Sequence, residues 1–193
     1  MDLFMNKLYG PLSRFADAHL YLTMDVIKRN GSISRKALAK ELGIGEGSVR
    51  SIIRIMKDWE VLDVRRTGIR LTQFGEYTYD NIPISLENIQ NENFALGDFQ
   101  QGILVKGVAK DVTNGMLQRD IGVRYGSKGA SVFVMTNGRL MMPMNWDMDQ
   151  KDPDFAEKVR ATGMDERDVF LLVGSDDPIS SRVAAVSIAL EML

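Results

Sequence analysis

The sequence contains no cysteine and a single histidine. The absence of cysteine excludes disulfides, zinc sites built on thiolates and cysteine nucleophiles. The one histidine, His19, stands among apolar residues in a segment with helical periodicity, so we assign it a packing or surface role rather than metal ligation. We therefore expect no metal and no cofactor.

Long apolar runs are also lacking: none approaches the run of about 18 residues that marks a membrane helix. Residues 1–12 contain Asp2 and do not have the layout of a signal peptide. These two absences predict a cytoplasmic protein that has no membrane partner.

The net charge of −2 is small, but charge is unevenly distributed along the chain. Residues 28–75 hold eleven Lys/Arg and five Asp/Glu, a net of +6, whereas residues 83–193 hold eleven and sixteen, a net of −5. A basic segment followed by an acidic one indicates that only the first part binds phosphates.

The basic segment has the pattern of two helices joined by a tight turn. Residues 34–42 form a short amphipathic helix with Ser34 as its N-cap, and Gly43 begins the turn. In the next helix, residues 46–58, apolar side chains recur at i, i+3, i+4 and i+7, which predicts one buried face. The opposite face carries Ser48, Arg50, Ser51, Arg54 and Lys57.

Two short strands, residues 61–66 and 69–71, follow this helix and predict a hairpin around Thr67 and Gly68. Its arginines are Arg65, Arg66 and Arg70. A turn, an amphipathic helix with an Arg/Ser face and a basic hairpin together are typical of a winged helix-turn-helix that binds duplex DNA through the major groove. The alternatives are a solvated basic helix, a solvated hairpin tip, and a winged helix that binds protein.

A further helix, residues 72–81, is stopped by Ile82 and Pro83, which we take as the domain boundary. We predict a winged domain at 1–82, with a first helix from Ser13 to Arg29. A linker or first extended segment follows at 83–98, and a small α/β domain occupies 99–193. Patterning in the last segment predicts about four strands (102–109, 130–135, 139–142, 169–173) and three helices (114–125, 154–161, 178–192). The fold class is therefore a two-domain α+β or α/β arrangement.

Two loops in the second domain are candidate ligand sites. The residues singled out are Arg119, Asp120, Lys128 and Gly129 around the first loop, and Gly174, Ser175, Asp176 and Asp177 in the second. The second loop follows a strand and precedes a helix, where open α/β sheets usually bind ligands. The competing interpretation is that Asp177 caps a helix that begins at Pro178, which accounts for every residue of that loop except Gly174.

An acidic run contains Asp147, Asp149, Asp152 and Asp154, which invites a calcium interpretation. It lacks the glycine and the closing glutamate of the calcium-binding loop, so we predict an acidic surface loop. No Ser-His-Asp set, paired carboxylates, phosphate-binding loop or dinucleotide fingerprint is present in the sequence.

Several motifs resemble one family when taken in order. They are Gly45-x-Gly47-Ser48-Val49-Arg50, Leu71-Thr72-x-x-Gly75, Gln118-Arg119-Asp120, Gly126-x-x-Gly129-Ala130 and Val173-Gly174-Ser175-Asp176-Asp177. From about Leu20 onward the chain resembles an uncharacterised archaeal family of winged helix-turn-helix proteins with a C-terminal domain of unknown function. This resemblance implies a transcriptional regulator and lends no catalytic residues.

The sequence thus predicts a DNA-binding regulator that is not an enzyme. We expect a homodimer, because one short recognition helix reads too few base pairs, and a C-terminal domain that dimerises or senses a small effector. Two alternatives stay open: a small-molecule enzyme or ligand-binding protein whose activity lies in the C-terminal domain, and a protein-interaction adaptor.

Overall fold

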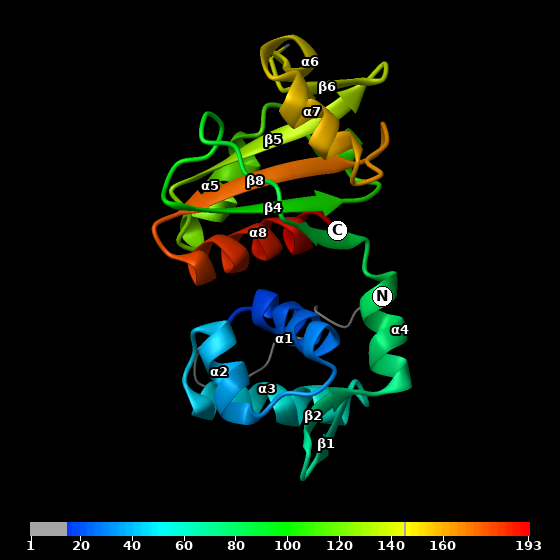
Figure 1. The fold of residues 1–193 in the computed structure, drawn as a ribbon, viewed down its shortest axis with the longest axis vertical. Coiled ribbons are helices and arrows are strands. Elements are labelled where there is room, and N and C mark those ends of the chain that lie inside the picture. Colours follow the sequence, from blue (N-terminus) through cyan, green and yellow to red (C-terminus); the bar gives the residue numbers. More distant parts are fainter. Residues whose placement is uncertain (1–14, 145) are drawn as a thin grey trace. The chain divides into compact units, whose positions relative to one another are not determined.

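The computed structural model describes residues 15–144 and 146–193. This part of the chain divides into two compact units, one that ends at Ile82 and one that spans Pro83–Leu193. Figure 1 shows both units. None of the described helices is both long and apolar enough to cross a membrane.

The first unit contains four helices and one hairpin within its described residues. In order they are α1 (Asp17–Asn30), α2 (Arg35–Leu42), α3 (Glu46–Asp58), β1 (Leu62–Arg65), β2 (Gly68–Leu71) and α4 (Gln73–Asn81). The predicted start of the first helix at Ser13 lies outside the described residues. The other helices begin and end within about two residues of their predicted limits, because their caps are local signals in the sequence.

The hairpin is tied to the helices by a bridge between Ile33 and Ile69. Each residue donates its amide to the carbonyl of the other, at N···O distances of 3.0 and 2.8 Å. Ile33 immediately precedes the N-cap of α2, so this bridge fixes the hairpin against the start of that helix. Both side chains are buried.

The second unit is built on one six-stranded sheet in the order β3-β4-β8-β5-β6-β7, and every neighbouring pair is antiparallel. Its strands are β3 (Ile84–Glu87), β4 (Phe99–Val105), β5 (Gly129–Thr136), β6 (Arg139–Met142), β7 (Trp146–Asp147) and β8 (Val169–Ser175). Its helices are η1 (Ala109–Asp111), α5 (Met116–Arg124), α6 (Met148–Lys151), α7 (Pro153–Arg160) and α8 (Pro178–Met192).

The two faces of this sheet are covered by different helices. Successive side chains of a strand point to opposite faces, and in the central strand β8 Phe170 and Leu172 join a core with Phe155 of α7. The rings of Phe155 and Phe133 stack with centroids 5.0 Å apart in this core. On the other face α8 lies along β4 and β8, and α5 packs between β5 and α8 (Figure 1).

The predicted two-domain mixture of helices and sheet is confirmed, but the sheet has six strands where about four were expected. The additional strands are β3 and β7, which have four and two residues. Strands this short carry too little alternation to be detected by periodicity. The antiparallel order also removes the argument that placed a ligand after β8, because that rule belongs to open α/β sheets with parallel strands.

The turn between β5 and β6 consists of two residues, Asn137 and Gly138. Asn137 and Gly138 both have positive φ, at 51° and 74°, and Thr136 pairs directly with Arg139. A two-residue loop with positive φ at both central positions is typical of a type I′ turn. Asn137 and Gly138 therefore close a two-residue hairpin between β5 and β6.

Candidate nucleic-acid interface

The turn between α2 and α3 is fixed by caps that the sequence encodes locally. The Ser34 hydroxyl accepts a hydrogen bond from the amide of Ala37 at 3.2 Å, which satisfies a free donor at the start of α2. Gly43 ends the helix in the left-handed conformation, at φ 65°. This turn lets α3 leave α2 in a new direction while both helices share one core.

Helix α3 has one buried face and one basic edge. Its four apolar residues at i, i+3, i+4 and i+7 are buried, as predicted: Val49, Ile52, Ile53 and Met56. Arg50, Arg54 and Lys57 follow at i, i+4 and i+7 on the exposed side, so they form a cationic stripe along the helix. No ion pair or hydrogen bond within the described part of the chain engages these three side chains.

The two serines of α3 lie differently from the arginines. Ser48 and Ser51 are both half-buried, and the Ser51 hydroxyl donates to the carbonyl of Gly47 at 3.3 Å. At about 100° per residue, these serines fall on the opposite edge of the exposed surface from Arg50. The structure thus separates two groups that the sequence pattern placed on one face.

The hairpin separates its three arginines. Residues that pair directly across an antiparallel hairpin share a face. Asp63 opposes Arg70, so Arg70 and Arg65 lie on the face that carries Asp63, whereas Arg66 lies in the turn beyond the last paired residue of β1. Arg65 also forms an ion pair with Asp63 at 2.5 Å. The three wing arginines therefore form two sets with different surroundings.

The geometry brings arginines from three elements to one hollow. An open hollow of about 440 Å³ lies between the start of α2, the exposed edge of α3 and the hairpin. The arginines among its lining residues are Arg35, Arg50, Arg65 and Arg66. Arg35, which is not among the predicted site residues, lines the same hollow as Arg50. The signal available for it was its position in the first turn of the helix before α3.

Arg70 lines a second hollow, on the side of the hairpin that carries Asp63. Lys28 and Glu76 also line this hollow. Lys28 is paired with Asp80 at 3.0 Å, so positive and negative groups alternate here. Arg65 lines this hollow as well as the first, whereas Arg70 lines only the second of the two.

Two glycines around the hairpin have no room for a side chain, and Gly68 also has a positive φ of 129°. A Cβ on Gly68 would overlap the Ser32 hydroxyl, and a Cβ on Gly75 would overlap the carbonyl oxygen of Val61. Gly45 and Gly47 at the start of α3 differ: nothing lies within 4 Å of a Cβ built on either. The unit's own packing therefore does not demand glycine at the start of α3.

A buried polar network that the sequence did not reveal joins α1 to α4. The Tyr79 hydroxyl donates to Asp25 at 2.9 Å, and Arg29 donates to the same carboxylate at 2.7 Å. Burial, followed by the charge of Asp25, raises the pKa of Tyr79 to about 12. Asp25 and Arg29 are an i,i+4 pair that helical spacing can indicate, but Tyr79 is 54 residues from Asp25, so no local pattern identifies it as their partner. The network fixes α4, which follows the wing, on α1.

In the second unit the two predicted loops meet, but internal contacts account for their residues. Lys128 forms an ion pair with Asp176 at 2.7 Å, and its pKa is raised by this hydrogen bond. Asp177 caps α8 by accepting from the amide of Ser180 at 2.7 Å, as the competing interpretation predicted.

Gly174, the one residue that capping left unexplained, faces the backbone of Leu96. A Cβ at Gly174 would overlap the carbonyl oxygen of Leu96. Ser175 is buried and its hydroxyl bonds to the backbone of Asp177. Gly129 pairs with Gly174 in the sheet, and Arg119 pairs with its neighbour Asp120 on α5. Each candidate ligand residue therefore has a contact within its own unit.

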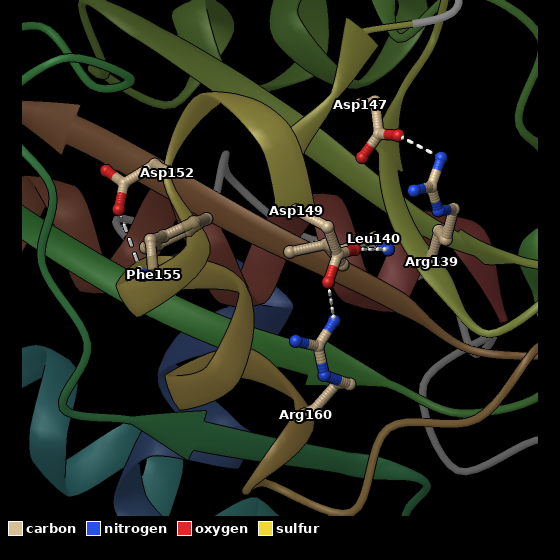
Figure 2. A network of polar contacts seen from close by, with 7 residues as sticks. All are labelled: Arg139, Leu140, Asp147, Asp149, Asp152, Phe155 and Arg160. Atoms are coloured by element: carbon tan, nitrogen blue, oxygen red, sulfur yellow. Dashed lines mark hydrogen bonds and ion pairs between the residues drawn. The ribbon is translucent and has the colours of Figure 1, made fainter.

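Figure 2 shows that the aspartates of the acidic run point to separate partners. Asp147 pairs with Arg139, and Asp149 accepts from the amide of Leu140 and pairs with Arg160. Asp152 caps α7 through the amide of Phe155. Although partial burial acts to raise the pKa of Asp149, its hydrogen bonds from Leu140 and Arg160 lower it overall. Among the described residues no group of three or more His, Asp or Glu is arranged to hold a metal ion.

Comparison with known families covers both units. Residues 96–192 match the model of a family described as a domain of unknown function, DUF4443. The chain belongs to this family. In this DUF4443 protein, residues 18–85 also match the model of the CggR N-terminal DNA binding domain. The second match covers the helices and the wing of the first unit and the whole of the basic segment at 28–75.

One solved structure shares the fold of this DUF4443 protein. A hypothetical protein, PH0730, from Pyrococcus horikoshii OT3 is 18% identical, covers 93% of each chain and superposes with a TM-score of 0.77. At this identity the match shows the fold alone. No curated protein matches the chain. The predicted pairing of a DNA-binding type of domain with a C-terminal domain of unknown function is thus confirmed, while archaeal origin stays a prediction.

Proposed function

We propose that this protein is a sequence-specific regulator that binds duplex DNA through α3 and the β1–β2 wing. In this proposal Arg50 and Arg54 reach base edges in the major groove, and Lys57, Arg35 and Arg66 contact phosphates beside it. Ser48 and Ser51 are shorter contacts on the other edge of α3. The coarser statement, a DNA-binding type of N-terminal domain, has the support of the family match over residues 18–85.

The observation that carries the proposal is the convergence of Arg35, Arg50, Arg65 and Arg66 on one open hollow. Four guanidinium groups gathered in this way repel one another unless an anion lies between them. Only Arg65 among them has an ion pair within the described residues, and that pair is exposed and therefore weak. A polyanion that follows the surface from α2 across α3 to the wing fits this arrangement.

The C-terminal unit is assigned a role in dimerisation or effector sensing, with no chemistry of its own. Its net charge of −5 disfavours DNA, and its candidate loops are accounted for by caps, close backbone contacts and ion pairs. A small effector would regulate DNA affinity only by binding one dimer geometry better than another.

The test is selection of binding sites from random duplex DNA by the full chain at physiological salt. Arg50→Ala/Arg54→Ala is the test variant, and Lys110→Ala/Lys158→Ala, which removes the same charge from exposed positions of the second unit, is its matched control. We expect an enriched site that the control retains. The test variant should lose about 100-fold in affinity, since each bidentate base contact is worth about 1–3 kcal/mol.

Two results would contradict the proposal. One is no enriched sequence, together with equal low-salt binding by all three proteins, which would show that α3 does not face DNA. The other is equal loss of affinity in the test and control variants, which would show that binding depends on net charge and not on α3.

A further inference from the structure

Among the described residues, helix α5 leaves an apolar stripe without a partner on the outside of the second unit. Its inner face is buried by Gln118, Ile121 and Gly122, and a Cβ on Gly122 would lie 3.0 Å from Ile188 of α8. On the outer face Met116 and Val123 are 52% and 51% exposed. They stand at i and i+7, two turns apart on one line of the helix.

This stripe is bordered by opposite charges on its two sides. At about 100° per residue, Arg119 lies roughly 50° to one side of the line through Met116 and Val123, and Asp120 roughly 50° to the other. Both side chains are more than half exposed, at 52% and 60%. Within the described residues of one chain, Arg119 and Asp120 form an ion pair with each other, with their nitrogen and oxygen atoms 2.8 Å apart, and with no other residue.

Such a surface is complementary to itself. A two-fold axis parallel to the helix places Met116 against Met116 and Val123 against Val123 of a second copy, as in an isologous interface. The same axis brings the Arg119 side of each helix against the Asp120 side of the other. An antiparallel pair would instead set arginine against arginine and aspartate against aspartate, so the charges select the parallel arrangement.

We propose that the outer face of α5 is the homodimer interface of this protein, with a second copy packed in parallel across Met116 and Val123. Two reciprocal Arg119–Asp120 ion pairs then flank the apolar contact. The proposal rests on the proposed function in one respect, since a two-fold dimer supplies the second α3 that a specific DNA site needs.

A nine-residue helix is too short to form a stable interface alone, because standard interfaces bury about 800 Å² on each partner. The neighbouring end of α8 extends the surface: Arg124 of α5 pairs with Glu191 at 3.0 Å, and Leu193 is 56% exposed. Leu117, which is 63% exposed, lies on the side of the stripe that Asp120 occupies. These residues widen the apolar contact around the two ion pairs.

The experiment measures the mass of the full chain by sedimentation velocity over roughly 1–100 µM, without DNA. Four proteins are compared: the natural sequence, Arg119→Asp, Asp120→Arg, and the double exchange Arg119→Asp/Asp120→Arg. Each single reversal places like charges together twice in the dimer, whereas the double exchange restores both attractive pairs with their signs inverted. Circular dichroism confirms that each exposed substitution leaves the fold intact.

We expect a dimer for the natural sequence and for the double exchange, and a rise of about 30-fold or more in the dissociation constant for each single reversal. Mixing the two single variants should give a heterodimer, because every cross pair is then attractive. A monomeric natural protein, single variants that still dimerise, or a double exchange that fails to restore the dimer would each overturn the proposal.

This readout is separate from the proposed function. A dimer that responds as expected but selects no DNA site would contradict only DNA recognition. If the protein selects a DNA site but its mass in sedimentation is the same for all four sequences, only the α5 interface is contradicted.

Discussion

At the scale of single residues, the position of a charge relative to its neighbours decides what it can bind. Arg66 and Arg70 are both exposed wing arginines, yet one lies with Arg50 around the first hollow and the other with Lys28 and Glu76 around the second. The two arginines carry the same charge, but their surroundings differ.

Replacing each of these arginines by alanine should therefore give different losses. Arg66→Ala should weaken binding to the selected DNA site by about tenfold, because a charge-assisted contact to phosphate is worth about 1.5–3 kcal/mol before water replaces part of it. Arg70→Ala should weaken binding to the same site by less than about threefold, since acidic groups share the hollow of Arg70 and reduce its attraction for phosphate. Fluorescence anisotropy at one fixed salt concentration measures both losses, and equal losses would contradict the assignment of Arg66 and Arg70 to different surroundings.

His19 gives the first unit a pH dependence of its own. Burial lowers the pKa of His19 below its usual 6.5, and its Nδ1 accepts a hydrogen bond from the amide of Ala16 at 3.0 Å. As pH falls through about 6.5 the unfolded chain takes up a proton before the folded unit does, so the free energy of unfolding decreases with falling pH.

Urea unfolding at pH 7.5 and pH 5.5 should show this loss of stability. Because His19 is the sole histidine of the chain, His19→Asn should remove most of the difference between the two pH values. A variant that keeps the full difference would show that another group is responsible.

At the scale of elements, the sequence predicted those parts of the fold that are encoded locally. The buried face and cationic stripe of α3 follow from helical periodicity, and the turn before it follows from Gly43. It did not predict β7, whose two residues pair with Met141 and Met142. Nor did it predict the position of Leu96 over Gly174, because that contact joins segments that are distant in the sequence. The separation of Arg66 from Arg70 depended on strand register and on the position of the turn, which only the structure supplies.

The N-terminal turn of α3 offers a test of what its glycines are for. Gly47 is exposed, lies within the helix and has open space where a Cβ would stand, so Gly47→Ala should stabilise the first unit by up to about 1 kcal/mol. If the proposed orientation holds, the added methyl group meets the DNA backbone and affinity falls. Thermal unfolding and DNA binding of this variant should move in opposite directions, and a variant that is more stable and binds equally well would contradict a close approach of DNA at this turn.

At the scale of the whole molecule, the proposed dimer should determine how binding responds to salt. Each protomer contributes its own set of phosphate contacts, and each contact releases a condensed counterion. A dimer bound through two copies of α3 therefore releases about twice as many ions as a monomer.

The slope of log Kobs against log salt should accordingly be about half as steep for Asp120→Arg as for the natural sequence. The double exchange Arg119→Asp/Asp120→Arg should return it to the natural value. Titrations between about 50 and 200 mM salt measure these slopes, and equal slopes for the two proteins would show that one protomer alone makes the contacts to DNA.

The bridge between Ile33 and Ile69 has a consequence for the order in which the first unit folds. It joins two short segments across the whole of α2, α3 and β1, so its hydrogen bonds close a long loop of chain. Closing such a loop costs entropy that is recovered only when the intervening helices have packed. The amide of Ile69 should therefore gain protection from hydrogen exchange late in refolding and lose it only in openings that also expose the core beneath α3.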